Sequence, residues 1–242
     1  MPESAFCQVA IDTPLRQLFD YRLPAPHAVA PGMRVRVPFG RREVVGLVMR
    51  LSSTTDIAPD KLREVQAVLD EQPLLDAAGI ALLEWAANYY HHPVGEVVAT
   101  ALPKGLRVLR KRPQKPPTAK AAVQTSAAAA RELPYPLSDA QHTALQALQM
   151  ATGAGNFLLD GVTGSGKTEV YLQAVAAVLA RGGSVLVLCP EIGLTPQLLE
   201  RFQRRFDAPI AALHSGLTDA ARARAWLTAA RGEARIVIGT RS

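Results

Sequence analysis

The stretch Gly161-Val-Thr-Gly-Ser-Gly-Lys-Thr168 decides the fold of the C-terminal half of this chain. It matches GxxxxGK[ST] at every fixed position and stands between an apolar run and a segment with helical features. Glycines let backbone N–H groups approach phosphate oxygens without a Cβ clash, and a helix N-terminus adds partial positive charge. In such a loop Lys167 reaches the β- and γ-phosphates and the Thr168 hydroxyl is a ligand of Mg²⁺. The stretch predicts a nucleotide-binding loop, with a simple glycine-rich turn as the alternative.

Strand-like and helix-like segments alternate around this loop. Apolar runs that suit strands buried on both faces of a parallel sheet lie at 156–160, 184–189, 210–213 and 235–239. Helices are predicted at 138–150, at 166–181, from the Thr195-Pro196 cap onward, and at 219–231 after Thr218. The order predicts an open α/β sheet with flanking helices.

Composition bounds the protein class. The chain has 242 residues, of which 48% are hydrophobic and 20% charged, so wholesale disorder and collagen-like structure are excluded. A net charge of +6 allows a polyanionic partner without requiring one. Cys7 and Cys189 stand far apart and form neither a disulfide framework nor a zinc motif, which fits a reducing compartment. No export or membrane segment is recognisable, so we expect a soluble cytoplasmic protein without a membrane partner.

A basic, proline-rich stretch divides the chain. Between Lys104 and Lys120 there are seven basic residues and no acidic one, and prolines and alanines follow. Prolines at this density prevent a continuous helix. We therefore expect domains at 1–104 and 137–242 joined by a linker at 105–136, which is either simply solvated or lies along phosphates.

The N-terminal part has the pattern of a small sheet with a helix. Apolar and other residues alternate over 33–39, a second strand is expected at 44–51, and a helix at 73–90. On this helix Trp85, Tyr89 and Tyr90 recur at helical spacing, which predicts that they belong to the core.

Several motifs resemble one family of DNA helicases. The first helicase lobe of the PriA family, replication-restart enzymes of superfamily 2, is similar to LSDAQ at 137–141, GVTGSGKTEVYL at 161–172, PEIGLTPQ at 190–197, LHSGL at 213–217 and IGTRS at 238–242. The resemblance implies an α/β chain in which a RecA-like lobe follows a small β-rich domain. It also implies ATP and Mg²⁺ as cofactors.

The resemblance assigns residues to two parts of this lobe. Lys167 and Thr168 would be the catalytic residues, Thr168 also as the Mg²⁺ ligand, and Gln141 would read the adenine edge. The nucleotide would contact Gly161, Val162, Thr163, Gly164, Ser165, Gly166, Lys167, Thr168, Glu169 and Gln141. The DNA side would hold Thr195, Gly239, Thr240 and Arg241.

The N-terminal part resembles the family domain that holds a 3′ DNA end. The similar stretches are Phe19-Asp20-Tyr21, 34–40 and 89–93. The resemblance implies a pocket for the terminal nucleotide made by Phe19, Asp20, Tyr21 and Gly40, with Arg63 either on a phosphate or on a solvated surface. Without the family, Phe19 and Tyr21 would be assigned to the core.

The implied function is an ATP-dependent 3′→5′ DNA helicase that binds forked and single-stranded DNA and initiates primosome assembly. Single-stranded-DNA-binding protein and other primosome proteins would be its partners. Two departures are expected: the 105–136 interval is too short for the family's winged-helix domain, and no DEAH strand, second lobe or zinc module follows residue 242. Zn²⁺ is therefore expected only in a missing C-terminal part.

Those departures leave two other readings open. One is a non-catalytic DNA-3′-end-binding fragment with a remnant nucleotide-binding lobe, and the other is a P-loop kinase. The kinase explains neither PEIGLTPQ nor the separate N-terminal module.

Overall fold

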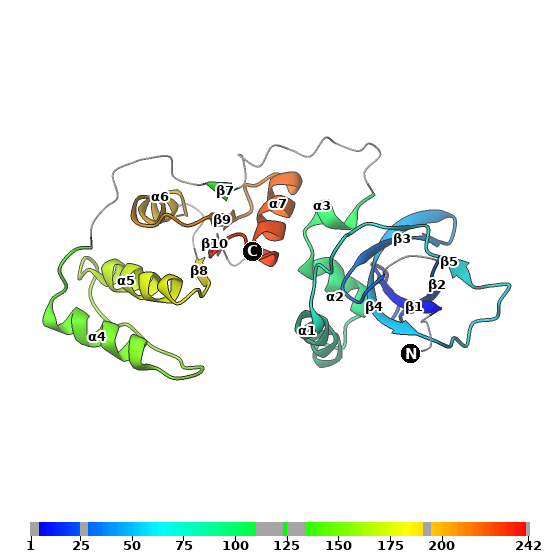
Figure 1. Ribbon diagram of the computed structural model, residues 1–242, viewed down its shortest axis with the longest axis horizontal. Coiled ribbons are helices and arrows are strands. Elements are labelled where there is room, and N and C mark those ends of the chain that lie inside the picture. The colour runs from blue at the N-terminus through cyan, green and yellow to red at the C-terminus, as the bar shows by residue number, and fades with distance from the viewer. Residues whose placement is uncertain (1–4, 25–28, 110–122, 125–133, 191–194, 241–242) are drawn as a thin grey trace. The chain divides into compact units, whose positions relative to one another are not determined.

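The computed structural model describes the chain outside residues 1–4, 25–28, 110–122, 125–133, 191–194 and 241–242. The chain divides into two compact units, residues 1–117 and 118–242, each described here by itself (Figure 1). The division falls within the 105–136 segment. Among the described residues no helix combines the length and apolar composition needed to cross a bilayer.

The N-terminal unit is built on a six-stranded sheet of order β5-β2-β1-β4-β3-β6. Its strands are β1 (Phe6–Ile11), β2 (Phe19–Arg22), β3 (Arg34–Phe39), β4 (Arg42–Ser52), β5 (Arg63–Glu64) and β6 (Ala67–Val68). Val35 and Val37 are fully buried while Arg34 and Arg36 between them are half-buried, as the alternation predicts. With Val9 and Val48 they form the core over one face of the sheet.

Three helices accompany this sheet. They are α1 (Ala77–Tyr89), α2 (Val94–Ala101) and α3 (Lys104–Arg107). Helix α1 begins after Asp76, whose carboxylate accepts a hydrogen bond from Gly79 N at 2.8 Å, and not at Pro73 as expected. Helix α2 lies close to β1, because a Cβ on Gly95 would stand 1.7 Å from the carbonyl oxygen of Ile11.

A buried ion pair stabilises the β3–β6 side of the sheet. The Arg34 guanidinium lies 2.6 Å from the Asp70 carboxylate, and the two side chains are 15% and 7% exposed. The same guanidinium donates to the carbonyl of Leu106 at 2.7 Å. One side chain thus links β3, the segment after β6, and helix α3.

The C-terminal unit has a four-stranded sheet of order β7-β9-β10-β8. Its strands are β7 (Val123–Gln124), β8 (Val185–Cys189), β9 (Ile210–Leu213) and β10 (Ile236–Thr240), and its helices are α4 (Asp139–Met150), α5 (Lys167–Ala180), α6 (Thr195–Arg205) and α7 (Asp219–Ala230). Strands β8 and β9 run parallel to β10, and β7 pairs antiparallel with β9. The helicase-like parallel sheet with flanking helices that the alternation predicts is therefore present.

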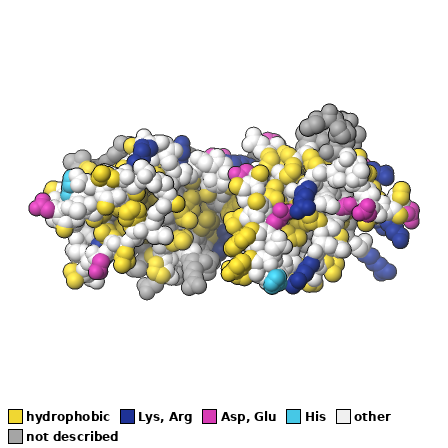
Figure 2. Space-filling model, turned by 90° about the horizontal axis from the view of Figure 1, so that it is seen from below, with side chains coloured by type: hydrophobic (Ala, Val, Ile, Leu, Met, Phe, Trp, Pro, Cys, Tyr) yellow, Lys and Arg dark blue, Asp and Glu magenta, His cyan; other side chains and the backbone are white. Residues whose placement is uncertain are grey.

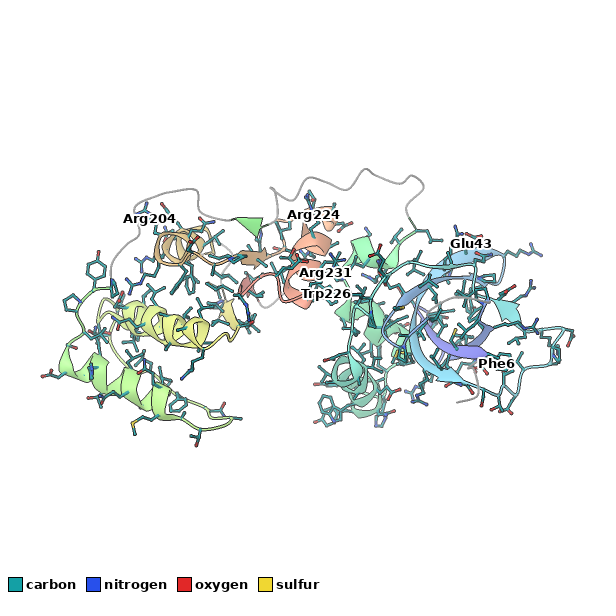
Figure 3. All side chains as sticks on the ribbon, viewed as in Figure 1. Phe6, Glu43, Arg204, Arg224, Trp226 and Arg231 are labelled. Carbon is teal, nitrogen blue, oxygen red and sulfur yellow. The ribbon has the colours of Figure 1, made fainter. Side chains whose placement is uncertain are left out.

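The helices cover the two faces of this sheet (Figure 1). On one face α5 and α6 pack over Ile236 and Ile238 of β10. On the other face α7 packs over β9 through small residues that include Ala211 and Ala225. Figure 3 labels Arg224 and Trp226 on α7 and Arg231 at its end.

Side-chain caps begin two of these helices, and the predicted cap at Thr218 is confirmed. The Ser138 hydroxyl accepts from Gln141 N, and the Gln141 side chain accepts from Ser138 N, which together make a capping box at α4. The Thr218 hydroxyl accepts from Ala221 N at the start of α7.

One predicted strand was wrong. The apolar run 156–160 forms no strand with any described residue, and Phe157 and Leu158 are 54% and 92% exposed. A strand requires a hydrogen-bonded neighbour, and none lies beside this run in the described part of the sheet. Strand β8 also differs from the expectation of burial on both faces, because Leu186 and Leu188 are exposed.

Candidate functional sites

The first candidate site lies around β2 and the turn between β3 and β4. The rings of Phe19 and Phe39 meet edge to face with centroids 5.0 Å apart. The Tyr21 hydroxyl donates to the carbonyl of Pro38 at 2.9 Å. Gly40 ends the strand at φ +61°, and no atom lies within 4 Å of a Cβ placed on it. Phe19 and Tyr21 therefore support the turn, and Gly40 leaves its outer side open.

Asp20 points to the other face of β2 and is held from two sides. Gln8 Nε2 donates to one carboxylate oxygen at 3.1 Å, and the Thr55 hydroxyl donates to the other at 2.6 Å. Both partners are neutral donors, so they do not neutralise the half-buried carboxylate, which retains lone pairs for a further donor. Gln8 and Thr55 were not identified from the sequence, because they come from β1 and from a loop 35 residues away.

The outer edge of β2 is only partly covered. Strand β5 pairs with Tyr21 and Arg22 and places exposed Arg63 beside Tyr21. Among the described strands none pairs with the outer edge at Phe19 and Asp20. One small region of the sheet thus carries the unpaired backbone groups of this edge, the Asp20 carboxylate and the Arg63 cation.

Two buried side chains on the core face of β1 and β2 stay uncharged. Burial raises the pKa of the Cys7 thiol to about 12, with a contribution from the nearby Asp20 charge. Burial also raises the pKa of Tyr21 to about 12. The backing of the site is therefore neutral at physiological pH, and Asp20 supplies its negative charge.

The second candidate site is the loop that the glycine pattern predicts. Gly164 and Gly166 have φ values of +85° and +80°, where only glycine is comfortable. Helix α5 begins immediately afterward at Lys167. A Cβ on Gly166 would lie 2.3 Å from the Gln141 amide nitrogen, so a larger residue here would displace the Gln141 side chain from the loop.

Two polar side chains hold this loop. Lys167 Nζ donates to the carbonyl oxygens of Gly161 and Val162, the latter at 2.9 Å. Gln141 Nε2 donates to the carbonyl of Ser165 at 2.8 Å, while its oxygen accepts from Ser138 N. Lys167 therefore lies over the interior of the loop, and Gln141 ties the loop to α4.

An ion pair joins the start of α5 to the end of α6. Arg205 lies 2.8 Å from Glu169, and the side chains are 6% and 12% exposed. Gln173 donates to the same carboxylate at 2.8 Å and to the carbonyl of Tyr135 at 3.0 Å. Glu169 thus ties the start of α5, next to Thr168, to the end of α6.

A cavity of about 640 Å³ opens beside the loop. Its lining combines loop residues with residues of α5, α6 and the segment before α4: Tyr135, Thr163, Gly164, Gly166, Lys167, Thr168, Glu169, Leu172 and Arg201. The sequence did not single out Tyr135 and Arg201, because they carry no motif, and Leu172 is only the last residue of the 161–172 motif.

The residues expected on the DNA side are only partly described. Helix α6 begins at Thr195, Gly239 is buried near the end of β10, and Thr240 is paired with Cys189 of β8. Because β8 and β10 are parallel, their carboxyl ends share one edge of the sheet. Arg241 and residues 191–194 of the PEIGLTPQ motif lie outside the described residues.

The expectation that three α1 aromatics belong to the core was wrong. Trp85, Tyr89 and Tyr90 are 54%, 64% and 69% exposed. The Trp85 and Tyr89 rings stack with centroids 5.0 Å apart, and Tyr90 meets Tyr89 edge to face. Helix α1 buries Ile80, Leu83 and Ala87 instead, and hydrophobic side chains gather around its outer side (Figure 2).

Family models match both units. The 3′DNA-binding domain of PriA matches residues 8–103, and the DEAD/DEAH box helicase model matches residues 138–242. The matched ranges contain the Asp20 region and the Lys167 loop respectively. The chain belongs to the PriA family.

Individual PriA relatives extend this result over nearly the whole chain. The replication restart protein PriA of Haemophilus influenzae is 35% identical, with 97% of this chain and 41% of the relative aligned. PriA of Treponema pallidum is 36% identical over 97% of this chain and 35% of its own length. PriA of Bacillus subtilis is 46% identical over 45% of this chain. The chain thus spans about two fifths or less of the PriA proteins that it matches along its length, as an N-terminal PriA portion would.

The two longer PriA alignments differ in extent. The Haemophilus alignment runs over 302 positions, so at least 60 of them hold a residue of the relative alone, because this chain has 242 residues. The Treponema alignment runs over 241 positions. PriA proteins therefore differ by several tens of residues in the length that aligns with this chain.

Proposed function

We propose that this chain is the front part of an ATP-dependent 3′→5′ DNA helicase that recognises stalled forks and initiates primosome assembly in replication restart. The observation that carries the proposal is the order of a PriA-type 3′DNA-binding domain and a nucleotide loop in one chain. In this proposal the protein acts in the cytoplasm with single-stranded-DNA-binding protein and other primosome proteins.

The proposed DNA-end pocket follows from the chemistry around β2. A terminal 3′-hydroxyl or a base N–H donates to Asp20, whose carboxylate Gln8 and Thr55 hold in place. The uncovered backbone edge at Phe19 and Asp20 supplies further hydrogen bonds, and Gly40 lets the nucleotide approach the turn. Arg63 neutralises a neighbouring phosphate.

The proposed nucleotide site is the Gly161–Gly166 loop with Lys167 and Thr168. Bound phosphates displace Lys167 from the loop carbonyls and accept its hydrogen bonds, and Thr168 is a ligand of Mg²⁺. Reading of the adenine edge by Gln141 requires its amide to release Ser138 or Ser165. Thr195, Gly239, Thr240 and Arg241 hold DNA phosphates on the other side of the lobe.

Fluorescence anisotropy with forked DNA tests the pocket. We expect the chain to bind a 3′-hydroxyl end more tightly than a 3′-phosphate end, because the Asp20 carboxylate accepts a hydrogen bond from a hydroxyl and repels a phosphate. Asp20→Asn should reduce this preference, whereas the exposed control Asp60→Asn should leave it unchanged. Equal affinity of the unaltered chain for the two ends would rule out the pocket.

A second function is supported by the unpaired and exposed apolar residues of the C-terminal unit. Run 156–160 is unpaired in the described residues, and Leu186 and Leu188 of β8 are exposed. These features favour a non-catalytic DNA-3′-end-binding fragment as the activity of these 242 residues alone. ATPase assays with and without single-stranded DNA separate the two: DNA-stimulated hydrolysis supports the helicase, and its absence with intact end binding supports the fragment.

A further inference from the structure

The turn between β3 and β4 carries two adjacent arginines next to the proposed DNA-end pocket. Strand β3 ends at Phe39 and β4 begins opposite it at Arg42, so Gly40 and Arg41 form a two-residue turn between them. Gly40 has a φ of +61°, which suits the first residue of such a turn. Both arginine side chains are exposed. The tip of this hairpin therefore presents two positive charges to solvent.

The register of the hairpin places Arg42 beside the pocket. Residues that lie directly opposite in an antiparallel pair have their side chains on one face, with Cβ atoms about 5 Å apart. Arg42 is opposite Phe39, whose ring meets the ring of Phe19 with centroids 5.0 Å apart. On the other flank, β5 places Arg63 beside Tyr21. Cations from two separate segments thus flank the aromatic side chains of the pocket.

The two flanks differ in their charge balance. Residues 36–43 contain three basic side chains and one acidic one, Glu43, which is labelled in Figure 3 and lies 3.7 Å from Arg36. Among the described ion pairs none includes Arg41 or Arg42. Residues 60–64 around Arg63 contain two basic and two acidic side chains, so their charges cancel. A polyanionic strand is therefore attracted more strongly to the turn than to the β5 flank.

We propose that a single DNA strand leaves the end pocket over the β3–β4 turn, where Arg42 and Arg41 bind phosphates upstream of the terminal nucleotide. The inference rests on the proposed binding of a 3′ end and adds the path of the strand away from it. Arg63 stays next to the terminal nucleotide, Arg42 contacts the second linkage from the 3′ end, and Arg41 at the tip contacts a linkage further upstream. A guanidinium donates paired N–H groups to phosphate oxygens, which suits this role.

Fluorescence anisotropy of the 242-residue chain with a labelled single-stranded oligodeoxythymidine tests the path. For single strands, each phosphate contact steepens the fall of log affinity with log salt by about 0.7. Arg41→Gln and Arg42→Gln should each reduce the slope by about this amount and weaken binding about threefold at low salt. Arg42→Lys should keep the slope, because it keeps the charge.

The matched control for this experiment is Arg50→Gln. It also removes one positive charge from the N-terminal unit, but Glu84 lies 2.6 Å from Arg50 and already matches that charge. We expect the slope of this variant to equal that of the unaltered chain. A slope reduced as much as in Arg42→Gln would show that only the net charge of the unit matters, and the path over the turn would be wrong.

An oligonucleotide with one neutral linkage locates the contact of Arg42. A methylphosphonate at the second linkage from the 3′ end removes the charge that this side chain is proposed to bind. Because two changes that remove the same interaction are not additive, Arg42→Gln should then cost less than about 1.5-fold in affinity. A full threefold loss with the modified strand would overturn the assignment of Arg42 to this linkage.

The outcomes separate the path from the proposed pocket on which it rests. If the unaltered chain binds 3′-hydroxyl and 3′-phosphate ends equally, the pocket fails and the path fails with it. If the preference is present but Arg41→Gln and Arg42→Gln keep the full slope, the pocket stands and the path is wrong. If the path is correct, both variants keep the preference for the 3′-hydroxyl, because Asp20 is intact. Circular dichroism confirms that the variants are folded, as the exposure of both side chains predicts.

Discussion

The two units support their candidate sites by different means. In the N-terminal unit the Asp20 region lies on a sheet whose core residues Val9, Val35 and Val48 are fully buried. In the C-terminal unit the nucleotide loop follows a run, 156–160, that pairs with no described strand, and single side-chain bonds hold it. Each such bond contributes only about 1 kcal/mol. The comparison teaches that a packed core backs the first candidate site, whereas individual side-chain bonds hold the second.

The comparison predicts that the same leucine-to-alanine substitution costs much more stability in the N-terminal sheet than in the C-terminal sheet. Leu47 of β4 is 1% exposed and Leu186 of β8 is 64% exposed. Leu47→Ala should lower the free energy of unfolding by about 2–5 kcal/mol, because it leaves a cavity in packed surroundings. Leu186→Ala removes the same atoms from a side chain that is already exposed to solvent. It should change the free energy of unfolding by less than about 0.5 kcal/mol.

Urea denaturation followed by circular dichroism measures both costs. Hydrogen exchange of β4 and β8 amides assigns each cost to its own unit. A loss of several kcal/mol in Leu186→Ala would mean that the outer face of β8 is covered in solution, and the comparison would fail.

Alkaline pH should destabilise the N-terminal unit selectively. The folded-state pKa values of Cys7 and Tyr21 are raised from 9.0 and 10.0 to about 12. The folded unit therefore holds these protons more tightly than the unfolded chain does. This stabilisation is complete below pH 9 and is lost as the pH rises toward 12, at up to about 1.4 kcal/mol per pH unit for each group.

Urea denaturation at pH 8.0, 9.5 and about 10.5 measures this loss, because these values lie below, between and above the ordinary pKa values of the two groups. Cys7→Ala should weaken the dependence on pH, because one of the two titrating groups is gone. An unchanged slope in this variant would show that burial of the thiol does not contribute.

Gln141→Ala should loosen the nucleotide loop by a smaller amount. The variant removes half of the capping box at α4 and the bond to Ser165. We expect a local cost of about 1 kcal/mol, seen as roughly fivefold faster amide exchange at the start of α4 and in the loop. Gln149→Ala on the exposed surface of the same helix is the control. Equal exchange in the two variants would show that the loop is held by other contacts.

Local patterns predicted the parts of this fold whose causes are local. The glycine loop, the Thr218 cap and the alternation in β3 each depend on a few neighbouring residues, and each is present. The run 156–160 was assigned to a strand because its composition suits one. A strand also needs a neighbour, and no local pattern supplies that information.

The polar partners in both sites could not be predicted from the sequence for a similar reason. Thr55 reaches Asp20 across 35 residues, and Arg205 reaches Glu169 across 36. Tyr135 and Arg201 line one cavity although they come from separate segments. The motifs therefore located the loop and the terminal-nucleotide region, while tertiary contacts decide which other side chains complete them.

Helix α1 shows why periodicity alone misplaced its aromatics, and it provides the smallest predicted effect. Both faces of the helix carry apolar residues, so helical spacing does not decide which face packs on the sheet. Leu83 is 7% exposed and Trp85 is 54% exposed. Trp85→Ala should cost only about 0.5 kcal/mol, because its ring contacts are on the surface, whereas Leu83→Ala should cost about 2–5 kcal/mol.

Chemical denaturation of the two variants measures this difference on one helix. If Trp85→Ala costs as much as Leu83→Ala, the aromatic face is packed in solution and the original assignment to the core is restored. If the cost is small, Trp85, Tyr89 and Tyr90 contribute little to folding. The stability of the N-terminal unit would then not depend on which residues form the outer face of α1.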